Sequence, residues 1–205
     1  MDINTINSSS AVIEMLKEIV DKVAFFYCKR DEDDRRDRQK ILRSLVKQLA
    51  CPASGTGIYL AVRDAYTKDQ QDPFARHTLT IEASLTLLAS LIEGYQNPVI
   101  VLDALDECPP ESRVFILKDF LSLIAKSKRT VKVLISSRHS LDIEDRLREL
   151  PHVCIEARDN AEDIENYVKT EIAMRVQDCR LLRGKASQEL TEHIQDVLLG
   201  GAKGM

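Results

Sequence analysis

PVIVLDALDEC, residues 98–108, is the stretch that decides the fold. Its first part is a short apolar run that stops at Asp103, and two more acids follow at Asp106 and Glu107. A short, continuous apolar run is typical of a strand that is buried on both faces, as in a parallel sheet. Ligands of such sheets bind outside the carboxyl ends of the strands, which is where these acids fall. We therefore expect a polar site at the end of this strand.

Three more apolar runs of strand length lie elsewhere in the chain. They are VAFFYC at 23–28, VKVLIS at 131–136 and HVCIEA at 152–157, and amphipathic helical patterns separate the runs. Parallel strands need a crossover of a dozen or more residues between them, usually a helix. The alternation therefore predicts a three-layer α/β fold with a mostly parallel sheet, strands at these runs and at 98–103, and helices on both faces.

The helical patterns also predict which side chains face the core. One helix follows the charged stretch RDEDDRRDRQK (30–40), which we interpret as a solvated loop and helix start, with a partner-binding patch as the alternative. Thr80 can cap a second helix, and Pro109–Pro110 can open a third. A last helix at about 187–199 should end at Gly200–Gly201. The expected buried faces of the first three are Ile41, Leu42, Leu45, Val46 and Leu49; Ile81, Leu85, Leu88 and Ile92; and Val114, Leu117, Leu121 and Ile124.

Composition excludes several classes of function. The 205 residues carry a net charge of -4 and no Trp, so nucleic acid is not an expected partner. No apolar run approaches the ~20 residues that span a membrane, and the N-terminus does not resemble a secretory signal. Five cysteines without CxxC spacing indicate reduced thiols and a cytoplasmic setting. Cys28, Cys108 and Cys154 fall in or beside predicted strands, so we expect them to be buried and inert.

The strand ends carry the residues from which chemistry is expected. Asp103, where a buried strand meets solvent, can hold Mg²⁺ directly or through water. Asp106 and Glu107 lie just beyond, within reach of a water that attacks a phosphate. Arg138 follows the strand at 131–136 and is a fixed cation suited to phosphate oxygens. The alternative is structural: Asp106 and Glu107 would cap the following helix, and Arg138 would pair with a surface acid.

Several of these segments resemble one family. VIVLDALDEC looks like the acidic, Mg²⁺-binding strand (Walker B) of NACHT-type STAND P-loop NTPases, as found in fungal NLR-like receptors and the nephrocystin-type N-terminal region. VKVLISSRH resembles their sensor strand, VAFFYC with the helix after it resembles their second strand, and DIENYVKTEI resembles the helical segment that follows the sheet. The resemblance runs from about Ser8 to the last residue.

The resemblance implies a function and a role for each site residue. Asp103 would be the Mg²⁺ ligand, Glu107 or Asp106 would polarise the attacking water, and Arg138 would sense the γ-phosphate. Members of this family bind ATP or GTP with Mg²⁺, switch between nucleotide states and signal by regulated assembly in the cytoplasm. The implied partners are protein partners, including NLR-like receptors of the same class, rather than nucleic acid or membrane.

The chain departs from the family where a phosphate loop is expected. The pattern G-x-x-x-x-G-K-[ST] (Walker A) should precede SSSAVIEML, but MDINTIN stands there. We therefore expect a truncated P-loop NTPase-like domain without its first strand and phosphate loop. Residues 1–157 would be the partial NACHT core, and residues 158–205 would be the C-terminal helical segment of that region. ATP and Mg²⁺ should bind weakly or not at all, because the loop donates several hydrogen bonds to phosphate.

Three functions remain open from the sequence. The first is a nucleotide-binding NTPase module for which this chain supplies the acidic and sensor half. The second is a non-catalytic protein-interaction fragment that keeps the fold but binds no nucleotide. The third is a metal-dependent phosphatase or nuclease built on Asp103, Asp106 and Glu107, although alternate acids along one strand, the usual spacing, are absent.

Overall fold

The computed structural model describes residues 3–51, 57–71, 78–155, 159 and 161–202. The chain divides into two compact units, Met1–Glu149 and Leu150–Met205. The division predicted after residue 157 falls in the segment 156–158, which lies outside the described residues.

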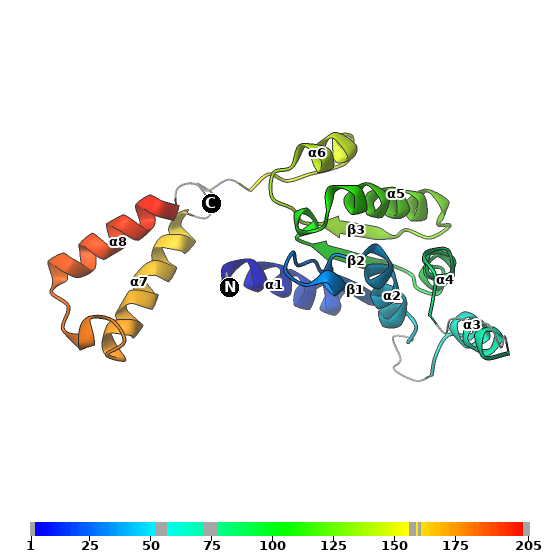
Figure 1. Cartoon of the computed structure of the whole chain (residues 1–205), viewed down its shortest axis with the longest axis horizontal. Coiled ribbons are helices and arrows are strands. Elements are labelled where there is room, and N and C mark those ends of the chain that lie inside the picture. Colours follow the sequence, from blue (N-terminus) through cyan, green and yellow to red (C-terminus); the bar gives the residue numbers. More distant parts are fainter. Residues whose placement is uncertain (1–2, 52–56, 72–77, 156–158, 160, 203–205) are drawn as a thin grey trace. The chain divides into compact units, whose positions relative to one another are not determined.

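The first unit is built on a three-stranded, all-parallel sheet (Figure 1). Its strands are β1 (Lys22–Tyr27), β2 (Pro98–Asp103) and β3 (Lys132–Ile135), in the order β1-β2-β3. The register pairs Tyr27 with Asp103 and Leu102 with Ile135, so the carboxyl ends of the strands meet at one edge. Three of the four predicted strands, and the parallel arrangement, are therefore confirmed.

The predicted fourth strand, HVCIEA at 152–157, is wrong over its described part. Residues 151–155 form no strand, and residues 156 and 157 lie outside the described residues. The side chains of Val153 and Ile155 are 88% and 72% exposed. An apolar run is stabilised as a strand only when neighbouring strands satisfy its backbone and a core buries its side chains. Neither holds for 152–155, and Cys154 is consequently exposed rather than buried.

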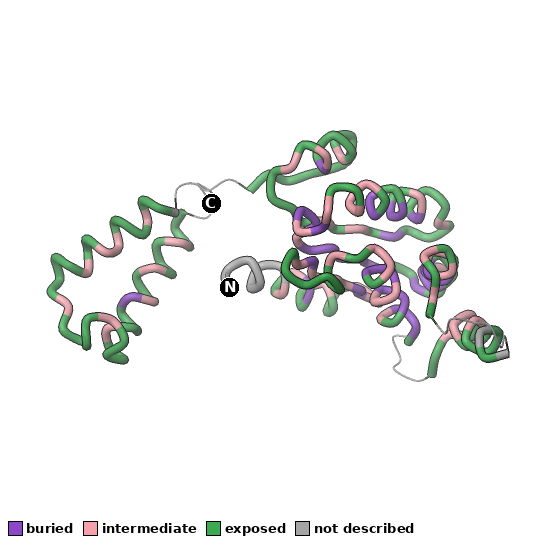
Figure 2. Tube along the Cα trace, viewed as in Figure 1, coloured by how far each residue is buried: buried purple, intermediate pink, exposed green. Residues whose placement is uncertain are grey.

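Helices cover both faces of this sheet, as predicted. On one face α1 (Ile3–Ile19) packs Ile13 against Val23, Val99 and Val101. On the other face Ile100 and Leu102 belong to a larger core, to which three helices contribute buried side chains. These helices are α2 (Arg38–Leu49), α4 (Ile81–Ile92) and α5 (Pro110–Lys126). Figure 2 shows that buried positions gather on the sheet and on the helix faces turned to it.

Local signals set where two of these helices begin. Asp37 accepts a hydrogen bond from the Lys40 amide at the start of α2, and Thr80 accepts one from the Ala83 amide at the start of α4. Each cap satisfies one of the amides that has no partner in a first helical turn. The predicted cap at Thr80 and the predicted buried face of α2 are both confirmed. The described residues of the first unit also form the α-helices α3 (Leu60–Gln71) and α6 (Leu141–Leu147).

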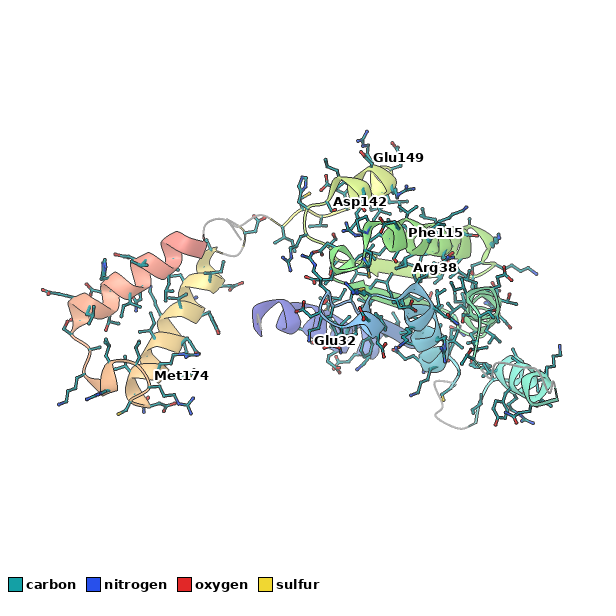
Figure 3. The ribbon with its side chains drawn as sticks, in the orientation of Figure 1. Glu32, Arg38, Phe115, Asp142, Glu149 and Met174 are labelled. Carbon is teal, nitrogen blue, oxygen red and sulfur yellow. The ribbon has the colours of Figure 1, made fainter. Side chains whose placement is uncertain are left out.

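A partly buried ion pair joins α2 to α5. The guanidinium of Arg38 donates two hydrogen bonds to Asp119, of 2.7 and 2.8 Å, and lies 5.2 Å from the centre of the Phe115 ring. Figure 3 labels Arg38 and Phe115 on their two helices. A bidentate pair of this kind fixes relative orientation as well as distance.

The predicted core face of α5 is wrong by part of a turn. The buried apolar residues are Ile116, Leu117, Phe120 and Leu123, so the predicted Leu117 is confirmed, whereas the predicted Leu121 and Ile124 are exposed. Both sets follow helical spacing, because the helix is apolar on more than one side. The face of α5 that packs into the core is the one that includes the larger Phe120.

The described part of the second unit contains two α-helices joined by residues 178–187. They are α7 (Ala161–Gln177) and α8 (Gln188–Ala202), with a 3-10 turn at Leu182–Gly184. Ile172 is the buried residue of α7. The helix α8 continues through Gly200–Gly201, where the sequence predicted its end. No helix among the described residues is long and apolar enough to cross a bilayer.

The corrected face of α5 predicts a clear difference between two neighbouring positions. Phe120→Ala should lower the free energy of unfolding by about 3–5 kcal/mol, because it opens a cavity in the core. Leu121→Ala should change it by less than about 1 kcal/mol, since that side chain is exposed. Urea denaturation followed by circular dichroism measures both. Equal losses in the two variants would contradict the assigned face.

Candidate functional site

The site begins where β2 and β3 end. Asp103 is the last residue of β2 and is only 6% exposed. Its Oδ1 atom accepts a hydrogen bond from the Ser136 hydroxyl, just after β3. The backbone of Ser136 continues the pairing, since its amide donates to Leu102 O at 2.9 Å. A carboxylate and a hydroxyl from neighbouring strands are thus held side by side.

A left-handed residue turns the chain directly after Asp103. Ala104 has φ 54° and ψ 50°, and its amide donates to the Ser136 hydroxyl oxygen at 2.9 Å. A 3-10 turn follows at Leu105–Glu107, anchored by the Leu105 amide, which donates to Ser136 O. Leu105 is fully buried and acts as the apolar anchor of the turn. This bend brings the next two acids back over the strand ends.

Arg138 bridges both of these acids. Its Nη2 atom donates to Glu107 Oε1 at 2.7 Å, and its Nε atom lies 3.4 Å from Asp106 Oδ2. Its backbone amide also donates to Asp106 Oδ1 at 3.0 Å. The Asp106 side chain is nearly buried, whereas the Arg138 side chain is 76% exposed. The arginine therefore covers the acids from the solvent side.

The loop after β1 closes the other side of the acidic turn. The amide of Arg30 donates to Glu107 Oε2 at 3.1 Å, and its Nε atom lies 3.7 Å from the same oxygen. Glu107 is thus held by residues that follow β1 and β3, while it stands after β2 itself. This carboxylate therefore links the segments that follow all three strands.

A cavity of about 260 Å³ lies beside this cluster. Its wall includes neither Asp103 nor Arg138 and is formed by Arg30, Arg36, Asp106, Glu107, Cys108, Pro109, Pro110 and Arg113. Arg113 fixes one side of it: Nε donates to Cys108 O at 2.7 Å, and Nη1 donates to Ser140 Oγ and to Asp142 Oδ1, both at 2.9 Å. Asp142 is labelled at the start of α6 in Figure 3. Arg113 therefore ties the acidic turn to α6.

Two buried thiols belong to the core next to the acidic turn. They are Cys28, just after β1, and Cys108, at the end of the 3-10 turn. The interaction with the Cys28 thiol lowers the pKa of Cys108 below its ordinary value, and the Arg113 guanidinium acts in the same direction. The interaction with Cys108, together with burial, raises the pKa of the Cys28 thiol.

The structure brings the four predicted residues to one edge of the sheet. Arg138 contacts Asp106 and Glu107 directly, and Asp103 accepts a hydrogen bond from Ser136. The alternative reading of these residues as purely structural is confirmed for Arg138, which pairs with acids. It is wrong for Asp106 and Glu107, because no side chain caps α5. Among the described residues, no three His, Cys, Asp or Glu side chains are grouped closely enough to hold a metal ion.

Sequence reasoning missed several residues of this site. Ser136 falls in the tail of a predicted strand, and Arg30 falls in a predicted solvated loop. Arg113 was not singled out, because nothing near it in sequence indicates contacts to Ser140 and Asp142. The one signal that could have found Ser136 is its place after β3, at the same edge as Asp103.

The comparisons with known proteins give one match. A family model described as Nephrocystin 3, N-terminal, matches residues 7–138, which is well over half of the chain and includes all four predicted site residues. No curated protein and no solved structure matches the chain significantly.

The contacts of Arg113 predict a strong effect on stability. Arg113→Ala should lower the free energy of unfolding by about 2–4 kcal/mol, because it leaves a carbonyl, a hydroxyl and a carboxylate without their shared donor. The free energy of unfolding of Arg113→Lys should lie between those of Arg113→Ala and the wild type, since an ammonium group cannot reproduce the planar set of donors.

The matched control is Arg146→Ala, which removes an exposed arginine of α6 and should change stability by less than about 0.5 kcal/mol. Urea midpoints measured by circular dichroism compare the three variants. An Arg113→Ala midpoint equal to that of Arg146→Ala would show that the contacts of Arg113 contribute nothing to stability.

Proposed function

The chain belongs to the nephrocystin 3, N-terminal family, and we propose that it is the acidic and sensor half of a magnesium–nucleotide site in a NACHT-type, P-loop NTPase-like signalling module. The observation that supports this best is the meeting of Asp103, Asp106, Glu107 and Arg138 at the carboxyl edge of β2 and β3. Ligands of parallel α/β sheets bind at that edge. The parallel order β1-β2-β3 agrees with part of such an NTPase sheet.

Asp103 would hold Mg²⁺, and the donor chemistry fits. The Ser136 hydroxyl lies at hydrogen-bond distance from its carboxylate, and both groups offer oxygen, which Mg²⁺ prefers over nitrogen or sulfur. The ion, when bound, supplies positive charge to the nucleotide phosphates. The Ser136 hydroxyl would orient the Asp103 carboxylate.

Arg138 would exchange a carboxylate partner for a phosphate. Its side chain is largely exposed and holds Glu107 by one hydrogen bond, so a phosphate group that enters the edge can compete for the guanidinium. Glu107, once released, or Asp106 would accept the hydrogen bond of a water next to the phosphate. The Arg138–Glu107 pair is thus the resting state in this proposal.

Affinity should be low, because the sequence contains no G-x-x-x-x-G-K-[ST] loop. Such a loop makes several charge-assisted hydrogen bonds to phosphate, each worth roughly 1.5–3 kcal/mol. The loss of three of them weakens binding by about a thousandfold or more, since 1.4 kcal/mol is tenfold.

A second candidate function is a protein-interaction module that keeps this fold without binding nucleotide. The observation in its favour is that the site is already satisfied. Arg138 and Arg30 neutralise Asp106 and Glu107, and Ser136 holds Asp103. The partners in that case would be proteins, including receptors of the same class. The metal-cluster enzyme has no comparable support.

A nuclear magnetic resonance titration of the chain with ATP and excess MgCl₂ separates the two candidates. The nucleotide proposal predicts saturable shifts of the amides of residues 136–138, with a dissociation constant of about 1 mM or weaker. Asp103→Asn and Arg138→Ala should each weaken that binding about tenfold or more, because each removes a charged contact. The control is Arg148→Ala, which removes an exposed arginine directly after α6 that pairs with Asp145, and it should leave the affinity unchanged.

Two results would overturn the nucleotide proposal. The absence of any saturable shift would favour the interaction module. Micromolar affinity that Asp103→Asn leaves intact would mean that another segment binds the phosphates. Circular dichroism of each variant verifies that it is folded before the titration.

A further inference from the structure

We propose that the hairpin formed by α7 and α8 is a self-association surface, which binds the same side of the hairpin in a second copy of this chain, with the two hairpins antiparallel. The inference concerns the second unit and does not depend on nucleotide binding. It starts from how little this unit buries: among its described residues, only Ile172 is buried. Most of the stability of a helix in a protein comes from packing its apolar face, and two helices alone cannot enclose a core.

Each helix of the hairpin turns one set of apolar residues toward the other helix. These residues are the less exposed ones, and they are Ile164, Val168, Ile172 and Val176 on α7 and Ile194 and Leu199 on α8. Figure 2 shows how small the buried part of the hairpin is, since it is confined to a short piece of α7. The contact between the helices therefore uses only part of their apolar surface.

A second set of apolar residues forms an exposed stripe on each helix. The stripes are Tyr167 and Met174 on α7, and Leu190 and Val197 on α8. Seven residues separate the members of each pair, so they stand on the same face of their helix. Each stripe lies about a third of a turn from the set that faces the other helix, in the same rotational sense on both helices. Because the two helices run antiparallel (Figure 1), this places both stripes on one side of the hairpin.

This apolar side is large enough for a dimer. The helix α7 has 17 residues, so it is about 25 Å long, and two packed helices are roughly 20 Å wide. Each copy therefore offers roughly 500 Å², and two copies would bury about 1,000 Å² in total, which reaches the lower end for a specific interface. The opposite side is unsuitable for burial, because it carries the exposed charges of Lys169, Glu192 and Asp196.

The charges at the two ends of the hairpin favour one orientation of the second copy. The open end, residues 161–168 and 196–202, has no lysine or arginine and carries the acids Glu162, Asp163, Glu165 and Asp196. The turn end, residues 175–187, has the single acid Asp178 and carries the basic residues Arg175, Arg180, Arg183 and Lys185. Parallel hairpins would place like charges together, whereas antiparallel hairpins place each basic turn beside an acidic end. Exposed ion pairs add little affinity, so the stripes supply the affinity and the charges set the orientation.

Sedimentation equilibrium of the whole chain at several concentrations tests the surface. We expect the wild type to form a concentration-dependent dimer. Met174→Glu, at the position labelled on α7 in Figure 3, and Val197→Glu should each weaken the dimer about tenfold or more, since two-fold symmetry places each new carboxylate in the interface twice. The matched control is Met15→Glu on α1, where the methionine is 56% exposed against 50% for Met174, and it should leave the dimer unchanged. Circular dichroism verifies that each variant is folded.

Charge reversal tests the orientation. Arg180→Glu/Lys185→Glu makes the turn end acidic, and Glu162→Lys/Asp163→Lys makes the open end basic. Each variant alone should dimerise several-fold more weakly than the wild type, because the turn and the open end of an antiparallel pair then carry the same sign. An equimolar mixture of the two should restore dimerisation as a heterodimer, since both contacts regain opposite charges.

Several results would overturn the proposal. A wild-type chain that stays monomeric at every concentration would show that the stripes do not bind a second copy. A dimer that Met174→Glu and Val197→Glu leave intact, or that Met15→Glu weakens equally, would place the interface elsewhere. Charge variants that dimerise like the wild type, or whose mixture does not restore dimerisation, would overturn the antiparallel arrangement.

Discussion

The strand β2 is buried along its whole length, and the rest of the first unit is arranged around that fact. Val99 and Val101 face the core under α1, whereas Ile100 and Leu102 face the core made with α2, α4 and α5. Both edges of the strand are also paired, with β1 on one side and β3 on the other. A strand with two apolar faces cannot end in an apolar residue at the surface without exposing it. The polar site is therefore the place where this central strand leaves the core.

This constraint explains how the site is assembled. Glu107 follows β2 but is held by Arg30 after β1 and by Arg138 after β3. Such contacts become possible because parallel strands deliver their carboxyl ends to one edge, ~4.8 Å apart. Opposite charges then neutralise one another in a partly buried place, where an unpaired carboxylate would be costly. The same neutralisation means that any anionic ligand has to compete with Glu107 for Arg138.

The sequence predicted those features that depend on local pattern. Short apolar runs identified β1, β2 and β3, and the cap at Thr80 identified the start of α4. Prediction from the sequence failed where the structure depends on contacts with residues distant in the chain. The rotation of α5 was decided by the sheet that the helix covers, since Leu117 and Leu121 have equal apolar character. The segment 152–155 has the composition of a strand, but composition supplies no neighbour to pair with. Within the site, the acids and Arg138 were recognisable by position, whereas contacts such as Arg113 to Asp142 were not.

The left-handed turn at Ala104 sets which residues position 104 can tolerate. A residue with a Cβ pays roughly 1–2 kcal/mol in this conformation, whereas glycine does not. Selection at this position therefore acts on the handedness of the backbone rather than on the chemistry of the side chain. Branched residues such as valine or isoleucine would be excluded although they are apolar and of moderate size, and asparagine would be accepted although it is polar. A hydropathy-based substitution scale would rank these replacements in the wrong order, and a mutational scan would identify position 104 by that inversion.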